Sequence, residues 1–355
     1  MTTKRTATFA DLHGFLLGPL WLFIPVFSHL YLGSAVWSIP FFFIGMPLID
    51  WLLGPDIATI DYTPAQQRYL HGVLLAYPFV HVLAMATTLA LLALTPMSPL
   101  NALWLALGMS LTLAGQGDAT AHELGHHANK WVRFGARVVL ATVGYGHFQI
   151  AHVRQHHIWV GTPKDPVSAP RGKSFYKFFG STLYHEYADA WKSELARLKH
   201  KQLSVLSWRN EMLMTLLGTL AVGSLCTIAA GGYGALFFAL TVVNSYFVLI
   251  GVNYMEHYGL SRKLQADGRY ERVTARHTWN APYRLTNWIW FNLQRHPDHH
   301  MHGGRKFYQL ESIAESPVLP TNYVGCLLLI LVPPLWFKIT HPRIDALSAD
   351  TPPAA

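Results

Sequence analysis

Long runs of apolar residues fill the first third of the chain and return after its midpoint. Six of them, at residues 14–33, 35–53, 69–94, 99–116, 211–230 and 232–251, approach the 20 or so residues that a helix needs to cross a bilayer. Within each consecutive pair the runs are only a few residues apart. The pattern therefore predicts an all-α integral membrane protein with six transmembrane helices arranged as three hairpins.

Polar segments at residues 117–210 and 252–320 follow the fourth and sixth apolar runs and predict a helical cap on one side of the membrane. A shorter apolar stretch, residues 323–337, contains Pro333-Pro334 and predicts an interfacial or re-entrant tail. We expect one domain over residues 1–355, with four transmembrane helices in 14–116, two in 211–251, and cap segments at 117–210 and 252–355.

The composition agrees with a membrane location. Hydrophobic residues make up 51% of the chain and charged residues only 13%, whereas soluble domains carry about 25% charge. The net charge of +8 could indicate nucleic-acid binding, but the distribution of the basic residues along the chain does not favour it.

The predicted outer connections, residues 32–35, 95–98 and 230–232, contain no Lys or Arg, so all 27 basic residues fall on the other side. The positive-inside rule then makes the cap and both termini cytosolic, in what we expect to be a bacterial inner membrane. Residues 1–14 lack the apolar run of a signal peptide. No nucleic-acid partner is expected.

Nine of the 20 histidines fall into four short blocks: His122-Glu-Leu-Gly-His126, His152-Val-Arg-Gln-His156-His157, Glu256-His257 and His296-Pro-Asp-His299-His300. On a helix, residues three or four apart lie on one face. The second and fourth blocks, like the first, should therefore each present their spaced imidazoles in one direction. His157 is rotated by about 100° around the helix axis from His156, so its ring can reach the same site only if the site is wider or the helix ends there. His127 is expected to lie beside a ligand or in solvent.

Such a convergence of imidazoles predicts a metal centre of more than one ion. Imidazole ligation is compatible with iron and does not exclude zinc or copper. One alternative is a membrane zinc protease, because His122-Glu123-x-x-His126 fits the signature in which the glutamate is a general base. That interpretation leaves the other seven histidines without a role. A histidine-rich site at a bilayer suits oxidation of an apolar substrate, whose unactivated C–H bonds need an oxidant made from O2.

Several motifs carry a resemblance to a known family. They are His122-Glu-Leu-Gly-His126, Gly144-Tyr-Gly-His147-Phe, His152-x3-His156-His157 with Thr162-Pro-x-Asp165-Pro, Asn253-Tyr-Met-Glu-His257-Tyr-Gly-Leu260, Asp267-Gly-Arg-Tyr270, and Leu293-Gln-Arg-His296-Pro-Asp-His299-His300. On these motifs the chain resembles the integral-membrane alkane hydroxylases of the membrane desaturase/hydroxylase superfamily.

The resemblance implies two iron ions held by the nine histidines (His122, His126, His152, His156, His157, His257, His296, His299 and His300), with no catalytic residue beyond these ligands. It implies hydroxylation of the terminal methyl group of an alkane with O2. It also implies electrons from NADH through a reductase and a rubredoxin or ferredoxin, for which the basic cap is a suitable docking face. Cys226 and Cys326 form no Cys-x-x-Cys pair, so the chain carries no iron–sulfur or rubredoxin-type centre of its own.

Four carboxylates adjoin the blocks and are candidates for fixing imidazole tautomers: Glu123, Asp165, Glu256 and Asp298. By resemblance, the second apolar run lines the substrate path. Within Phe41-Phe42-Phe43 we expect Phe42 to limit the depth of that path.

Two features depart from the alkane pattern. Ala151 stands where alkane hydroxylases usually have glutamate. The stretches Ile150-Ala-His-Val153 and Val332-Pro-Pro-Leu-Trp336 look more like the xylene-type methyl hydroxylases. Linear alkanes are the favoured substrate, and methyl groups of alkyl-aromatics are the alternative.

Overall fold

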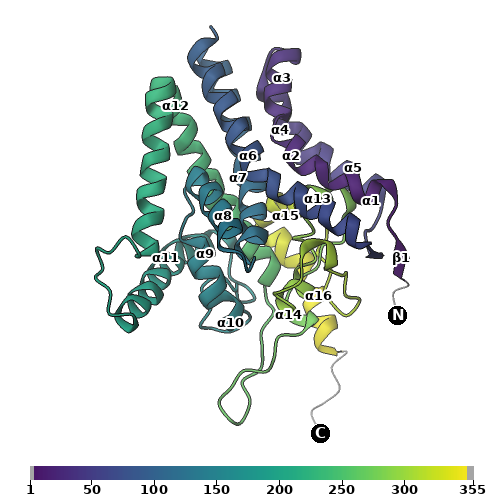
Figure 1. The fold of residues 1–355 in the computed structure, drawn as a ribbon. Helices are drawn as coiled ribbons and strands as arrows, with labels where there is room; N and C mark the ends of the chain where they lie inside the picture. The colour runs from purple at the N-terminus through teal and green to yellow at the C-terminus, as the bar shows by residue number, and fades with distance from the viewer. Residues whose placement is uncertain (1–3, 350–355) are drawn as a thin grey trace.

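The computed structural model describes residues 4–349 and is mostly helical, with α3, α6 and α12 extending toward one end and α11, α16, short helices and loops at the other (Figure 1). The α-helices are α1 (Phe9–His13), α2 (Leu17–Trp21), α3 (Ile24–Leu32), α4 (Ser38–Pro40), α5 (Met46–Leu53), α6 (Pro64–Leu94), α7 (Pro99–Gly125), α8 (Lys130–Val143), α9 (Phe148–Ala151), α10 (His157–Trp159), α11 (Phe175–His200), α12 (Glu211–His257), α13 (Arg284–Ile289), α14 (His296–Met301), α15 (Tyr323–Ile330) and α16 (Pro333–Ala349).

Three helical stretches are long and apolar enough to cross a membrane: Ala35–Leu53, Pro64–Leu94 and Glu211–His257. A pair of helical pieces, Phe9–Trp21 and Ile24–Leu32, would make a fourth span, with a bend of 65° between them. The chain is therefore an integral membrane protein.

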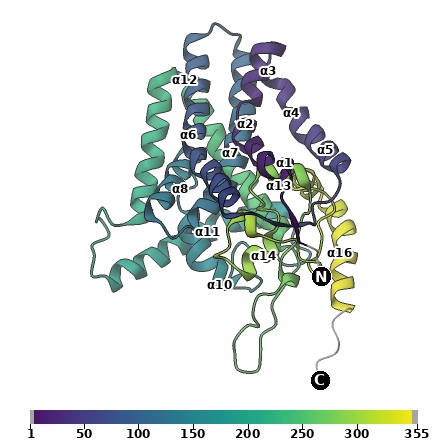
Figure 2. The same cartoon turned by 45° about the vertical axis from the view of Figure 1, so that its right-hand side comes forward.

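Element α12 is interrupted where the sequence predicts a connection. Ala230 and Gly231 have non-helical backbone angles, and Gly231 has φ of 57°, which glycine adopts without a steric penalty. The chain turns back here so closely that a Cβ atom on Gly234 would lie 1.9 Å from the carbonyl oxygen of Cys226. The two arms of α12 consequently run side by side (Figures 1 and 2).

The second apolar run is helical but irregular. A π-helix, η3 (Phe41–Gly45), separates α4 from α5. It lies between Pro40 and Pro47, and proline lacks the N–H that a regular helical hydrogen bond requires. This widened turn sets the directions of the three phenylalanine rings.

Helix α7 forms the centre of the fold and continues to Gly125, past residue 116, where the sequence predicted a span to end. All residues from Gln116 to Gly125 are buried. The helix stays regular because its polar side chains find partners inside the protein. Gln116 donates to the carbonyl oxygen of Ile289 (2.6 Å), and Asp118 accepts from the Ser245 hydroxyl on α12 (2.9 Å). This extension carries the first two histidines of the predicted site.

Two short strands, β1 (Lys4–Thr6) and β2 (Thr59–Asp61), form a parallel pair with Lys4 opposite Thr59. The all-α prediction was wrong to this extent. Residues 4–6 are too short and polar for a periodic signal, and their pairing depends on a contact across more than 50 residues.

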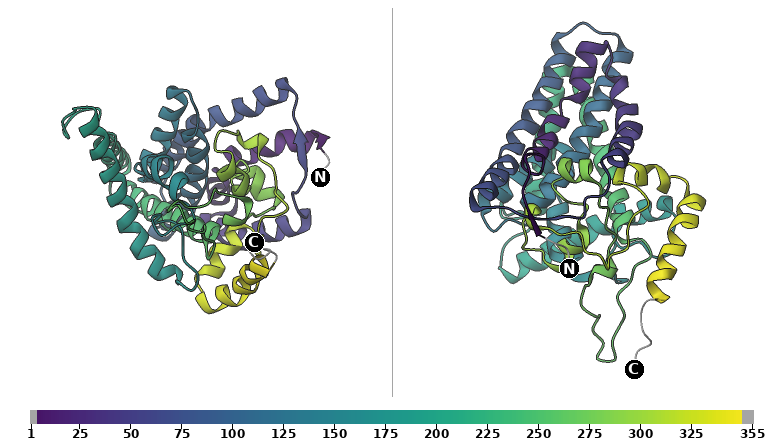
Figure 3. Two further views of the ribbon diagram at one scale, coloured as in Figure 1. Left: turned by 90° about the horizontal axis from the view of Figure 1, so that it is seen from below. Right: turned by 90° about the vertical axis from the view of Figure 1, so that its right-hand side faces the viewer.

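Buried Asp50 within α5 joins the apolar helices to the cap. Its carboxylate accepts from the Leu285 N–H (2.6 Å), the Thr286 hydroxyl (2.7 Å) and the Asn322 amide (2.7 Å). Helix α15, within the predicted interfacial tail, packs several buried side chains into the core beside α12. Helix α11 lies on the opposite side of the molecule from α1 and β1 (Figure 3).

Candidate metal centre

All nine histidines of the four blocks converge in the interior of the cap, in two adjacent groups. One group contains His122, His126, His152, His157 and His299, and the other contains His156, His257, His296 and His300. Within each group, one ligand nitrogen from every residue lies within 4.8 Å of the others. The His157 and His300 rings, 4.7 Å apart between centroids, bring the groups together.

The spacing of the nitrogens fits metal ligation. In the five-histidine group, Nε2–Nε2 distances are 3.0 Å for His126–His152 and 3.1 Å for His157–His299. In the four-histidine group, His296–His300 is 2.9 Å. With metal–nitrogen bonds of about 2.0–2.1 Å, neighbouring ligand atoms lie about 3 Å apart. A cation between these lone pairs would relieve their mutual repulsion.

The electrostatics also suit a metal. Burial lowers the pKa of His126 to about 4 and that of His157 to about 2, and His156 adds to the effect on both. Both rings are therefore neutral at physiological pH, and neutral imidazole is the form that ligates a cation. The buried Nε2 of His122 has no hydrogen-bond partner among residues 4–349, and a bound metal would satisfy it.

The first block behaves as predicted. His122 lies one turn before the end of α7 and His126 caps that helix, so both face the five-histidine group.

The second block does not behave as predicted, because His152 and His156 enter different groups. Residues 152–156 form a π-helix, η4 (His152–His156), in which hydrogen bonds join residues five apart. His157, five residues after His152, therefore joins it in the five-histidine group. His156 is directed to the four-histidine group.

The fourth block also divides. His296 and His300, four apart on α14, lie in the four-histidine group, whereas His299 lies in the other. Helix α14 thus stands between the groups and supplies ligand candidates to both.

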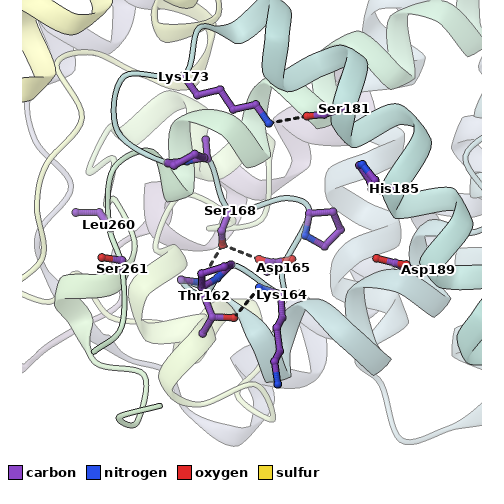
Figure 4. A pocket seen from close by; sticks show the side chains of 15 residues that line it. Thr162, Lys164, Asp165, Ser168, Lys173, Ser181, His185, Asp189, Leu260 and Ser261 are labelled. Atoms are coloured by element: carbon purple, nitrogen blue, oxygen red, sulfur yellow. Dashed lines mark hydrogen bonds between the residues drawn. The ribbon is translucent and has the colours of Figure 1, made fainter. Parts of the chain in front are cut away.

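Of the four predicted carboxylate partners, Asp165 is placed as expected. Its Oδ2 lies 2.9 Å from His156 Nδ1, which favours a proton on Nδ1 and leaves Nε2 for the four-histidine group. Asp165 also accepts from the Ser168 hydroxyl (2.6 Å) and lines a cleft of about 490 Å³ at the surface of the cap (Figure 4).

Glu256 is also at the site, where its carboxylate lies near a nitrogen of His296. Its Oε2 lies 3.3 Å from His296 Nε2, the nitrogen that faces the group, and its Oε1 accepts from the Tyr323 hydroxyl (2.5 Å).

Glu123 and Asp298 serve other contacts. Glu123 accepts from the backbone N–H of Phe307 (3.1 Å), and Asp298 accepts from His302 (2.7 Å) and Arg305 (2.8 Å). In the described part of the chain neither carboxylate hydrogen-bonds to one of the nine histidines. No contact among the described residues therefore supports the expected role of these two carboxylates in fixing imidazole tautomers, since a residue next to a histidine on a helix points about 100° away from it.

His127 lies outside both groups. Its ring stacks on His71 of α6 (5.2 Å between centroids) and accepts from the Asn129 N–H (3.0 Å). The ring is partly exposed.

Sequence reasoning missed Glu186, a buried residue of α11. Glu186 lines a small void, of about 10 Å³, together with Ala151, His152, His156 and Asp165. Burial raises the pKa of Glu186 to about 7, although the Tyr145 hydroxyl that donates to it (2.6 Å) opposes this rise. No spacing relates Glu186 to a histidine block, and only Tyr145, within Gly144-Tyr-Gly-His147-Phe, gave a signal.

Phe42 is the buried ring of its triplet, with 8% of its surface exposed, while Phe41 is 37% exposed. Its ring packs edge-on against Trp21 (4.8 Å) in a cluster that also contains Met46 and Ala119. Ala119 lies one turn before His122 on α7, so the cluster that contains Phe42 extends to the helix that carries the first histidine block.

The chain is similar to proteins of known families. The family model described as fatty acid desaturase matches residues 96–328. An alkane 1-monooxygenase of Pseudomonas aeruginosa is 36% identical over 309 residues, covering 85% of this chain and 81% of the relative. An alkane 1-monooxygenase of Ectopseudomonas oleovorans is 32% identical over 339 residues, covering 93% and 84%. The hydroxylase component of a xylene/toluene monooxygenase of Pseudomonas putida is 30% identical over 225 residues, covering 63% and 59%.

Proposed function

Because the chain belongs to the fatty acid desaturase family and is a histidine-cluster monooxygenase of the membrane, we propose that it hydroxylates the terminal methyl group of alkanes to give primary alcohols. The observation that carries this proposal is the burial of nine imidazoles in two groups, in a chain similar over most of its length to alkane 1-monooxygenases.

Two iron ions are the metals that we propose for the two groups, with His122, His126, His152, His157 and His299 around one and His156, His257, His296 and His300 around the other. Bound iron would supply the O2-dependent oxidation of an unactivated C–H bond. The protein keeps His126 and His157 neutral through burial, orients the His156 ring through Asp165 and surrounds the site with buried side chains.

We infer six membrane spans with the cap on the cytosolic side and a single domain over residues 1–355. The break at Ala230 and Gly231 supports counting α12 as two spans. The absence of Lys and Arg from the sequence at residues 32–35, 95–98 and 230–232 supports the orientation, which suits a bacterial inner membrane. Histidines from both cap segments share each group, which supports one domain.

Linear alkanes are preferred over alkyl-aromatics in this proposal. The alkane 1-monooxygenase relatives match more of the chain at higher identity than the xylene/toluene relative does. The channel must select by shape, since an alkane offers no hydrogen-bonding group.

Labelled oxygen separates this function from the zinc-protease alternative. With 18O2 the alcohol product should carry the label, and the purified protein should cleave no peptide. Glu123 is hydrogen-bonded to Phe307 rather than free to activate water, so Glu123→Gln should not behave as the loss of a general base. Label that entered from water, without product exchange, or metal-dependent peptidase activity lost in Glu123→Gln would contradict the proposal.

Phe42→Ala should shift the chain-length profile toward longer alkanes, because it removes a buried ring beside the core that contacts α7. Octane and hexadecane turnover should be compared in one mixture, with iron content measured in parallel. Phe41→Ala is the matched control, since Phe41 is more exposed. An unchanged chain-length profile in Phe42→Ala with normal iron content would show that Phe42 does not line the substrate path.

The electron carrier, a rubredoxin or ferredoxin reduced by an NADH-dependent reductase, is proposed to dock over the cleft shown in Figure 4. At its floor, Asp165 contacts His156, so the cleft gives a short route from the surface to the four-histidine group. Exposed Lys164 and partly buried Lys173, whose ammonium group donates to the Ser181 hydroxyl (2.7 Å), line the cleft and give it a positive charge that complements an acidic carrier.

Lys164→Glu should raise the carrier concentration for half-maximal rate by about three- to tenfold at low salt, with the saturated rate preserved. Lys201→Glu, at the far end of α11, is the control for an unspecific change of net charge. Equal effects of the two variants would show that the carrier does not dock at this cleft.

A further inference from the structure

An apolar groove of about 530 Å³ lies between α6 and α8, which pack side by side (Figure 2). Helix α6 contributes Leu75, Pro78, Phe79 and Val82, and α8 contributes Trp131 and Phe134 among others. Phe79 is 78% exposed and Trp131 is 70% exposed. We call this surface the α6–α8 groove.

The groove does not lead to the metal centre. Its floor includes Leu124, which is two residues from both His122 and His126 on or next to α7. Residues two apart on a helix point to nearly opposite sides. The groove therefore lies behind the helix that presents the histidines, and a substrate path to the metals would have to run elsewhere.

The charged side chains that α6 and α8 themselves contribute are of one sign. The sequence has no Asp or Glu from residue 62 to 117 or from residue 124 to 164, which include all of α6 and α8. Arg68 is on the same face of α6 as Leu75, Phe79 and Val82, by its spacing of 7, 11 and 14 residues. Lys130, at the first residue of α8, lies 5.3 Å from the centre of the Trp131 ring.

The two cations belong to one end of the groove. The His71–His127 stack joins the start of α6 to the segment that precedes α8. Within residues 4–349 Arg68 and Lys130 form no ion pair, whereas Arg133 and Arg137 are bonded to protein oxygens. Two exposed, uncompensated cations above an apolar, aromatic-lined groove match the headgroup and acyl chain of one kind of molecule.

We propose that the α6–α8 groove is a binding site for an anionic phospholipid, with its acyl chain against Phe79, Trp131 and Phe134 and its headgroup at Arg68 and Lys130. In the proposed topology this is a lipid of the cytosolic leaflet. The site is independent of the reaction, and its test uses binding alone.

Native mass spectrometry of the iron-loaded full chain in mild detergent, titrated with phosphatidylglycerol or phosphatidylcholine of equal acyl length, tests the site. The wild type should retain phosphatidylglycerol at lower concentrations. Each basic residue near an anionic lipid contributes about fivefold in binding, so Arg68→Gln with Lys130→Gln should weaken phosphatidylglycerol binding about 30-fold. Lys201→Gln with Lys263→Gln removes the same charge elsewhere on the exposed surface and should change little.

A second pair of variants tests the groove itself. Val82→Trp should fill it and weaken both lipids, whereas Leu83→Trp, on an exposed neighbouring face of α6, should weaken neither. Equal retention of the two lipids by the wild type, or equal losses in a variant and its control, would overturn the proposal. Displacement of phosphatidylglycerol by hexadecane would also overturn it, and would identify the groove as a hydrocarbon site.

Discussion

His156→Ala is expected to reduce iron from about two ions per chain to about one and to lower hydroxylation by more than about 100-fold. His156 is one of only four imidazoles in its group and the one that Asp165 orients. Removing it leaves three ligand candidates and takes one hydrogen-bond partner from the buried Asp165 carboxylate. The five-histidine group keeps all its members, so one iron should remain. Metal analysis and octane turnover on the same membrane-inserted preparation measure both effects.

His299→Ala is the complementary variant, because His299 belongs to the five-histidine group. It too should leave about one iron. His127→Ala is the matched control, since His127 adjoins His126 in sequence but stacks on His71 outside both groups. Stoichiometric zinc in active protein, or full iron content in His156→Ala, would contradict a di-iron centre built on these groups.

The identities of the clustered histidines could be predicted from sequence, but their partition could not. Spacing on a regular helix places His122 with His126, as observed. The same rule fails for His152 and His156, because it assumes 3.6 residues per turn and the chain forms a π-helix there. No sequence signal in residues 152–156 predicts the π-helix, which depends on the packing of the surrounding helices.

The carboxylates near the histidines were also only partly predictable from sequence. Asp165 could be named because it lies in a motif close to His156, and its contact with that ring is short. Glu186 could not, because it reaches the site from α11 through tertiary packing. Glu123 and Asp298 adjoin histidines in sequence, yet their helical positions turn them toward Phe307 and Arg305. The sequence thus predicts which residue types converge, and the folded helices decide which atoms meet.

The same reasoning applies to the apolar segments. Hydrophobicity marked helical segments, and the break in α12 falls at the predicted connection, but the predicted helix at residues 14–33 is broken by a 65° bend. It did not foresee that α7 extends to Gly125, since the partners that stabilise Gln116 and Asp118 come from Ile289 and Ser245, far away in the sequence.

The purified 355-residue chain is expected to be inactive with O2, octane and NADH alone. Each hydroxylation consumes two electrons, and the chain offers no cysteine centre to deliver them. Cys226 and Cys326 are both buried in apolar helices, and no Cys-x-x-Cys pair exists in the sequence. Adding a rubredoxin or ferredoxin with its reductase should raise alcohol formation from background by at least about 100-fold, the difference between no electron supply and a working one.

The dependence of carrier-driven turnover on ionic strength is a second test of this prediction. If the carrier docks on the basic cap, raising salt from about 0.01 to 0.15 M shortens the screening length from about 30 to 8 Å and should weaken the coupling. Dithionite-driven turnover without a carrier should respond far less to salt, which separates docking from a general effect on the enzyme. NADH-dependent turnover by the pure chain would refute the need for a carrier. Carrier-dependent turnover that is insensitive to salt would instead contradict electrostatic docking of the carrier on the basic cap. It would also contradict the role proposed for Lys164.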